Sequence, residues 1–143
     1  MTVDHAWHRP IMVVEDDPAI GELLTLRLET AGYQVTWVRD GAAAMDRIAD
    51  VLPKLVVLDL GLPILDGFQV LAKLRAQPLW RSLPIFVLTA RHSEEDVKRA
   101  IRLGATGYMA KPFDAKVLIS RIDKRLATKP PLERVVTRDW PSN

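Results

Sequence analysis

Acidic, hydroxyl and basic residues follow four short apolar runs of the sequence. Glu15 and Asp16 follow the first of these runs, Asp59 follows another, and Thr89 and Lys111 follow two more. Clustered carboxylates suit a hard divalent cation such as Mg²⁺, and a carboxylate can attack phosphorus to give an aspartyl phosphate. A lysine and a hydroxyl group would then pair with the phosphoryl oxygens. The pattern predicts magnesium-dependent phosphoryl chemistry, with Asp59 as the nucleophile because it is a single acid after a central-looking run.

The elements that must position these residues are five expected strands. The runs are rich in β-branched and other apolar residues, and three of them are apolar on both faces, which is typical of a parallel sheet covered on both sides. The expected strands cover residues 11–14, 34–39, 55–58, 85–88 and 106–110.

Helical patterns separate the expected strands. Asp17 followed by Pro18 is a typical helix start, and the three acids after Ser93 favour another start through the helix dipole. The expected helices run from Pro18 to a stop near Gly32, over 41–51, over 67–76, from Ser93 to Leu103, and from an Asp114 cap through Leu126. Leu23 and Val117 are expected on the apolar faces of the first and last helices.

The order of elements predicts an α/β fold, a doubly wound (βα)5 three-layer sandwich with right-handed crossovers. One domain is expected over residues 10–127, with an N-terminal leader over 1–9 and a C-terminal tail or linker stub over 128–143. Ligands of such sheets bind beyond the carboxyl ends of the strands. The acids, the hydroxyl group and the lysine are therefore expected to meet at one edge of the sheet.

Composition excludes several other classes of protein. The 143 residues include no cysteine, which excludes disulfides, thiolate nucleophiles and zinc sites with cysteine ligands. No apolar run approaches the roughly 20 residues of a membrane span, and residues 1–10 lack the apolar core of a signal peptide, so a cytoplasmic protein is expected. Neither glycine-rich phosphate loop, G-x-G-x-x-G nor G-x-x-x-x-G-K, is present.

Four motifs in this order resemble those of the response-regulator receiver family. They are Val13-Val14-Glu15-Asp16-Asp17, then Leu58 to Pro63 with Asp66-Gly67, then Leu88-Thr89-Ala90, and then Gly104 to Phe113. The resemblance implies a flavodoxin-like parallel sheet of order 2-1-3-4-5. It also implies a switch protein of two-component signalling, which catalyses its own phosphorylation and dephosphorylation but turns over no other substrate.

The resemblance implies a phosphoacceptor and a metal site. Asp59 would accept a phosphoryl group from a phosphohistidine on a histidine kinase or a histidine phosphotransfer protein. Asp16, Asp59 and the main-chain carbonyl of Gly61 would bind Mg²⁺, and Glu15 would contribute through water.

The resemblance also implies a phosphate-binding and switching group. Thr89 and the amide of Ala90 would hold the phosphoryl oxygens, and Lys111 would pair with the phosphate. Thr89 and Tyr108 would form the switch, in which the threonine moves toward the phosphate and the aromatic ring turns inward. The bond between Lys111 and Pro112 would be cis.

Simpler interpretations stand beside these roles. Asp17 precedes Pro18, which favours a helix cap over a third ligand, and Tyr108 is equally compatible with core packing. A degenerate receiver that binds partners without phosphorylation is one alternative function. A phosphatase with an aspartyl-phosphate intermediate is another, but such enzymes usually need a second acid two residues after the nucleophile, where this chain has Gly61.

Departures from frequent family patterns have physical content. Gly61 offers no side chain to orient a hydrolytic water, and Arg91 is a long cation expected to shield the phosphoryl group. Slow self-dephosphorylation is therefore expected. The last turn between a helix and a strand reads Ala105-Thr106-Gly107, without the paired acids of receivers attached to winged-helix DNA-binding domains. This weakens the expectation that the fourth and fifth helices dimerise in the manner of those receivers.

The formal charge of +2 conceals two opposed regions. Residues 1–90 carry 8 basic and 11 acidic groups, whereas residues 91–143 carry 12 basic and 7 acidic groups. Basic side chains of the expected fourth and fifth helices include Lys98, Arg102, Lys116 and Lys124. They form either ordinary solvated faces or a docking surface for an acidic effector protein. No direct binding of nucleic acid or membrane is expected, and the chain would be a monomer or a phosphorylation-dependent dimer.

Overall fold

The computed structural model describes residues 9–127 of the chain. The leader predicted over 1–9 and the tail predicted over 128–143 lie outside the described residues, with the exception of Arg9. Strands and helices alternate along the chain: β1 (Pro10–Val14), α1 (Pro18–Thr30), β2 (Gln34–Val38), α2 (Gly41–Val51), β3 (Leu55–Leu58), α3 (Gly67–Arg75), β4 (Ile85–Thr89), α4 (Glu94–Arg102), β5 (Gly107–Ala110) and α5 (Ala115–Ala127).

The strands form one parallel sheet in the order β2-β1-β3-β4-β5. This confirms the predicted doubly wound fold, with strand order reversing between β1 and β3. Residues Val14 and Leu58 are partners in the register of these two strands. Their carboxyl ends consequently lie side by side, and the residues that follow them are brought together.

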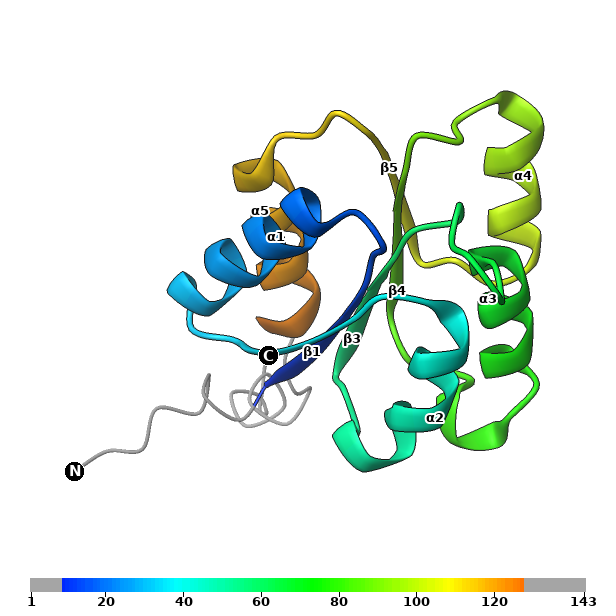
Figure 1. Cartoon of the computed structure of the whole chain (residues 1–143), viewed down its shortest axis with the longest axis horizontal. Coiled ribbons are helices and arrows are strands. Elements are labelled where there is room, and N and C mark those ends of the chain that lie inside the picture. Colours follow the sequence, from blue (N-terminus) through cyan, green and yellow to red (C-terminus); the bar gives the residue numbers. More distant parts are fainter. Residues whose placement is uncertain (1–8, 128–143) are drawn as a thin grey trace, which may run out of the picture.

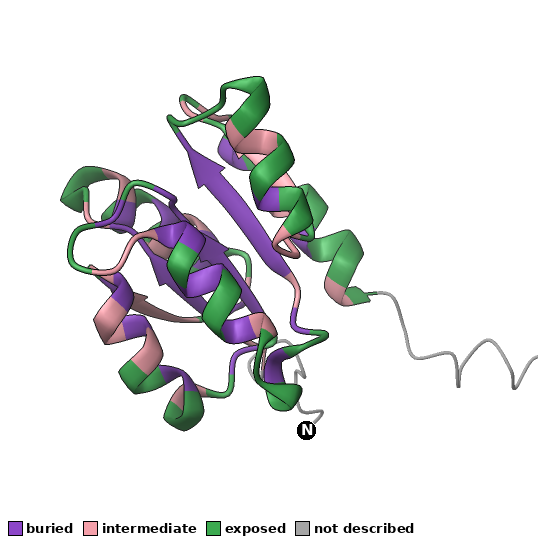
Figure 2. Ribbon diagram, turned by 90° about the vertical axis from the view of Figure 1, so that its right-hand side faces the viewer, coloured by how far each residue is buried: buried purple, intermediate pink, exposed green. Residues whose placement is uncertain are grey.

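Helices cover both faces of the sheet and make a three-layer sandwich. Figure 1 shows α1 and α5 on one face and α2, α3 and α4 on the other. Each face has its own cluster of buried apolar side chains, one including Phe68 and Leu71 and the other including Leu24 and Ile122. Burial of these apolar surfaces supplies most of the driving force for folding. The inner strands β1, β3 and β4 are almost entirely buried, whereas the outer strands β2 and β5 are mostly of intermediate burial; Figure 2 shows buried strands between the helices.

Local signals in the sequence define where several helices begin. The Asp17 carboxylate accepts a hydrogen bond from the Ala19 amide at 2.9 Å, so this acid is the helix cap favoured from the sequence. Asp66 and Gln69 form a reciprocal capping box at the start of α3. Ser93 accepts a hydrogen bond from an amide in the first turn of α4.

Two details differ from the expected pattern. Leu23 and Val117 are 41% and 42% exposed, so they lie at the margins of the apolar faces on which they were expected. A short 3-10 helix, Pro78–Trp80, lies between α3 and β4. Three residues are too few for a helical period to show in the sequence. Among residues 9–127, none of the helices has the length and hydropathy that a membrane crossing requires.

Arg75, the last residue of α3, connects three segments at the edge of the sheet opposite the acids. Its Nε and Nη2 atoms donate to the carbonyl oxygen of Gly104 at 3.0 and 2.8 Å. Its Nη1 atom donates to the carbonyl of Trp80 at 2.7 Å. One guanidinium therefore satisfies main-chain acceptors in the turn after α4 and in the connection before β4.

Candidate functional site

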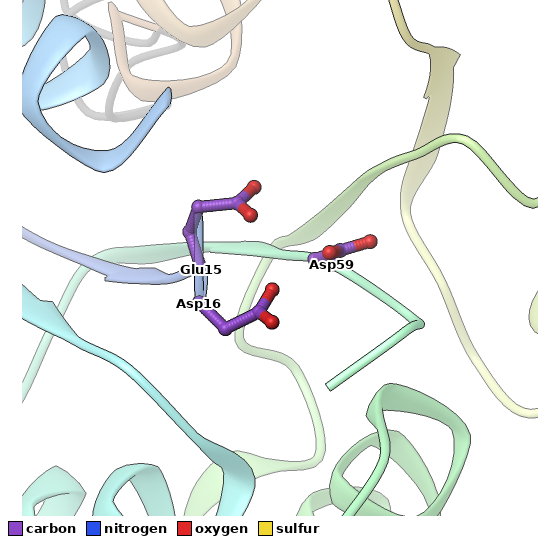
Figure 3. Close-up of side chains that lie close together, drawn as sticks. All are labelled: Glu15, Asp16 and Asp59. Atoms are coloured by element: carbon purple, nitrogen blue, oxygen red, sulfur yellow. The ribbon is translucent and has the colours of Figure 1, made fainter. Parts of the chain in front are cut away.

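Three carboxylates lie at the carboxyl ends of β1 and β3. Glu15 and Asp16 follow β1, Asp59 follows β3, and one oxygen of each lies within 4.8 Å of the others. Figure 3 shows Glu15 and Asp16 extending from one strand end toward the side on which Asp59 lies. Glu15 and Asp59 are 2% and 7% exposed, whereas Asp16 is partly exposed. The group is therefore a partly open acidic pocket.

The donor set fits a hard divalent cation. All three side chains offer carboxylate oxygens, which Mg²⁺ prefers, and the partly exposed Asp16 leaves access for the waters that Mg²⁺ retains. Close carboxylates repel one another unless a positive charge lies among them. Asp17, which caps α1, is not a member of this group.

Lys111 supplies one positive charge to the pocket. It follows β5, and its Nζ atom lies 2.7 Å from Glu15 Oε1 and 3.3 Å from Asp59 Oδ2. The main-chain amide of Lys111 donates a hydrogen bond to the carbonyl of Thr89 at 2.9 Å, which extends the β4–β5 pairing. The bond between Lys111 and Pro112 is cis, the isomer implied by the family resemblance. Lys111 is thus held in place from both its main chain and its side chain.

Burial and the lysine act in opposite directions on the pocket's charges. Burial raises the pKa of Glu15, and the hydrogen bond from Lys111 only partly offsets that effect. Burial alone would lower the pKa of Lys111, but the hydrogen bond to Glu15 and the charge of Asp59 outweigh it and raise that pKa. Lys111 therefore stays an ammonium group next to Asp59.

Thr89 and Ala90 lie at the end of β4. Thr89 is 1% exposed, and its hydroxyl oxygen accepts a hydrogen bond from the Arg91 amide at 3.0 Å. Ala90 is exposed. Thr89 is the register partner of Ala110, the residue before Lys111, so the hydroxyl-bearing and ammonium-bearing strand ends are neighbours.

Tyr108 and Arg91 extend this group along the next strand. The Tyr108 hydroxyl group donates a hydrogen bond to the carbonyl oxygen of Arg91. The Arg91 guanidinium lies 3.4 Å from Asp96 and 5.3 Å from the centroid of the Phe68 ring. In the unphosphorylated chain its charged end contacts an acid of α4 and an aromatic ring of α3, and shielding of a phosphoryl group by Arg91 stays a prediction.

Two further residues contact the acidic loop and were missed in the sequence. Neither Trp37 nor Arg39 was singled out as a site residue. Trp37 Nε1 donates to the carbonyl of Glu15 at 2.8 Å, and Arg39 Nη2 donates to the carbonyl of Asp16 at 3.1 Å. No local signal in the sequence could have found them, because the contacts depend on β2 lying beside β1.

The chain matches the family model described as the response regulator receiver domain over residues 11–123. It is 39% identical over 116 residues to the DNA-binding response regulator MtrA of Mycolicibacterium smegmatis, covering 81% of this chain and 50% of that protein. It is 37% identical over 121 residues to an uncharacterised 14.6 kDa protein of Leptolyngbya boryana, covering 85% of this chain and 92% of that protein. The chain thus spans about half the length of the DNA-binding regulator that it matches.

Solved structures agree with these relatives. The crystal structure of a putative response regulator from Chloroflexus aurantiacus superposes with a TM-score of 0.78 at 34% identity. The match covers 83% of this chain and 98% of that one. The similarity therefore extends over nearly all of the described residues.

Proposed function

The chain belongs to the response regulator receiver family, and from that premise we propose that Asp59 is its phosphoacceptor. Receiver domains are signalling modules of two-component systems rather than enzymes that turn over a substrate. The donor would be a phosphohistidine on a histidine kinase or a histidine phosphotransfer protein. The observation that carries the proposal is the position of the Lys111 ammonium, which contacts both Glu15 and Asp59 inside an acidic pocket.

The transfer is an in-line displacement at phosphorus. An oxygen of the Asp59 carboxylate forms the new O–P bond while the P–N bond to the donor imidazole breaks. The imidazole nitrogen keeps the electron pair of that bond and takes up a proton. The Lys111 ammonium, 3.3 Å from Asp59 Oδ2, is placed to pair with a phosphoryl oxygen after transfer.

The acidic pocket would hold the metal ion of the reaction. Asp16 and Asp59 would be direct ligands together with the Gly61 carbonyl, and Glu15 would act through water. When bound, Mg²⁺ supplies positive charge that offsets the negative charge of the carboxylates and the phosphoryl group. The Gly61 amide donates to Asp59 Oδ1 at 3.3 Å, which orients the acceptor carboxylate.

The phosphoryl group would change the hydrogen bonds of Thr89, the Ala90 amide and Tyr108, and these changes would alter the surface of the domain. The Thr89 hydroxyl would turn from the Arg91 amide to a phosphoryl oxygen, and Ala90 would donate a second hydrogen bond. Because Arg91 accepts a hydrogen bond from Tyr108 of β5 and pairs with Asp96 of α4, a shift of Arg91 would reach both elements. This chain of contacts is the proposed route of switching.

The proposed docking surface for an effector is the face formed by α4, β5 and α5. Lys98, Arg102, Lys116 and Lys124 are exposed on its helices. A cavity of about 380 Å³ at β5 and α5 is lined by apolar side chains that include Phe86 and Leu118 and by basic side chains that include Arg121. The apolar and basic side chains together fit an acidic segment of a protein partner. A cytoplasmic location follows as part of the same proposal.

Phosphorylation by a small donor tests the function. The purified chain is incubated with acetyl phosphate and Mg²⁺, and intact mass is measured. We expect an adduct of about 80 Da, one phosphoryl group, that is absent in Asp59→Asn and present in Asp46→Asn, an exposed acid of α2. No adduct in the wild-type chain would favour the degenerate receiver, and steady release of phosphate from phosphomonoesters would favour the phosphatase.

A further inference from the structure

The loop that carries Glu15 and Asp16 accepts two side-chain hydrogen bonds from β2 and from the residue that follows it. Trp37 Nε1 donates to the main-chain oxygen of Glu15 at 2.8 Å, and Arg39 Nη2 donates to the main-chain oxygen of Asp16 at 3.1 Å. Both bonds use carbonyl oxygens. The carboxylate oxygens of these two acids are not used by either bond: Glu15 Oε1 accepts from Lys111 and Glu15 Oε2 accepts from the Asp17 amide at 3.1 Å.

The register of the sheet places both donors at this loop. Val13 pairs with Trp37, Val14 pairs with Val38, and the Glu15 amide donates to the Val38 carbonyl at 3.0 Å. Arg39 is the first residue after β2, which ends at Val38. The Arg39 guanidinium carbon is 5.5 Å from the centroid of the indole ring, within range of a cation–π contact.

Helix α1 has a glycine, Gly21, where the indole ring of Trp37 packs against it. Gly21 lies in its first turns, and a Cβ atom there would overlap the Trp37 ring. A glycine inside a helix costs about 1 kcal/mol relative to alanine. Close contact with the ring gives a physical reason for this glycine, and it fixes the indole between α1 and the acidic loop.

We propose that Trp37 and Arg39 are positioning residues for the cation site. By fixing the main chain of Glu15 and Asp16, they hold two of the three carboxylates of the pocket in a ligand-ready arrangement before the metal ion binds. Such preorganisation strengthens binding because less ordering remains for the ligand to impose. This inference rests on the proposed function, which places Mg²⁺ among these acids.

The same bond makes the indole ring a reporter of the pocket. Its N–H group is bonded to the carbonyl of a residue whose side chain faces the cation, so binding of the cation shifts the polarity that the ring experiences. The tryptophan emission should therefore respond to Mg²⁺ through Trp37. Trp80, buried at the 3-10 helix, belongs to another part of the fold and should not respond.

Two variants remove the bond by different routes. Trp37→Phe keeps an aromatic ring but lacks the N–H donor. Gly21→Ala keeps Trp37 and displaces its ring, while raising the helix propensity of α1. Trp80→Phe is the matched control for the loss of a tryptophan. Mg²⁺ affinity is measured by calorimetry, emission is followed in the same titration, and thermal unfolding without metal shows whether each variant is folded.

We expect Mg²⁺ affinity to fall about two- to ten-fold in Trp37→Phe and in Gly21→Ala, the range for one lost hydrogen bond. Affinity should not change in Trp80→Phe. The emission response should disappear in Trp37→Phe, weaken in Gly21→Ala because the displaced ring loses its bond to Glu15, and persist in Trp80→Phe. Wild-type affinity in both folded variants would overturn this inference and leave the proposed function intact. A wild-type chain that binds no Mg²⁺ would overturn the proposed function and this inference together.

Discussion

The Tyr108 hydroxyl group donates a hydrogen bond to the main-chain carbonyl of Arg91, two residues after Thr89. The amide of the same residue, Arg91, donates to the Thr89 hydroxyl oxygen at 3.0 Å. One peptide segment therefore joins two hydroxyl groups on neighbouring strands. Burial raises the pKa of Tyr108, and the charge of Asp96 acts in the same direction, so the phenol keeps its proton and remains a donor.

Tyr108→Phe should separate phosphorylation from the response of α4. The variant lacks the donor to Arg91 but keeps the acidic pocket, so beryllofluoride with Mg²⁺ should still shift the amide resonances around Asp59. The accompanying shifts in Glu94–Arg102 should shrink to about half or less, because allosteric coupling of this kind is typically worth only 1–3 kcal/mol. Unchanged shifts in α4 would contradict the proposed route.

Lys111→Met should strengthen Mg²⁺ binding while reducing phosphorylation. The lysine competes with the cation for Glu15 and Asp59, which it contacts at 2.7 and 3.3 Å. Removal of one positive charge at this range should raise Mg²⁺ affinity on the order of ten-fold at an intermediate effective dielectric constant. Calorimetry measures the affinity, and intact mass after acetyl phosphate treatment measures the adduct. Weaker Mg²⁺ binding would show that the lysine organises the pocket rather than competing with the metal ion.

Gly61→Asn combined with Arg91→Glu should shorten the lifetime of the phosphorylated chain. A Cβ atom added at Gly61 meets nothing within 4 Å, so an asparagine side chain can start there without overlap, and its amide is expected to orient an attacking water. We expect dephosphorylation to accelerate on the order of ten-fold, less than full general acid–base catalysis contributes. Loss of the adduct over time is followed by mass. Gly61→Asn alone is the useful comparison, because Arg91→Glu also places an acid beside Asp96.

Tyr33→Phe should lower the free energy of unfolding by about 1 kcal/mol near pH 8, through loss of the bond from Tyr33 to Asp123. Burial and that bond raise the pKa of Tyr33 above its ordinary value of 10.0. Above pH 10 the unfolded chain therefore releases a proton that the folded chain retains, and wild-type stability falls with pH. Urea unfolding at pH 8 and pH 11 should show this fall to be smaller in Tyr33→Phe.

Charge reversal on the proposed docking surface should weaken binding of an acidic probe. A peptide rich in glutamate and leucine, labelled for anisotropy, should bind the wild-type chain more weakly as salt rises. At a fixed salt concentration, Arg102→Glu should weaken peptide binding several-fold relative to the wild-type chain. Arg47→Glu, at an exposed position of α2, should have little effect. Equal effects of the two substitutions would indicate attraction to overall charge and no defined docking surface.

The order of strands and helices made the place of the acidic pocket predictable. Once β1 and β3 are parallel neighbours, the residues after Val14 and Leu58 must lie together, whatever the details of packing. Cap residues were equally accessible to prediction, because Asp17 acts on amides only two and three residues away. Such features depend on chain direction and local spacing alone.

Contacts of long or edge-strand side chains were not predictable in this way. Arg91 could have faced the pocket, but Asp96 and the ring of Phe68 attract its guanidinium, and Phe68 is 23 residues away in the sequence. The sequence indicates no role for Trp37 beyond packing, because its acceptor, the Glu15 carbonyl, lies just after the neighbouring strand β1. Leu23 and Val117 show the same limit, since a helical period does not define how wide the buried stripe is.

Arg75 gives α4 one fixed end. Its guanidinium donates two hydrogen bonds to the carbonyl of Gly104, just beyond the helix. Near the other end of α4, Asp96 pairs with Arg91, whose amide donates to Thr89 at the pocket. A helix anchored at one end moves as a lever. A displacement that begins at Arg91 would therefore be largest near Ser93 and smallest near Leu103, and we expect α4 to pivot about the Arg75 contact rather than to slide along the sheet.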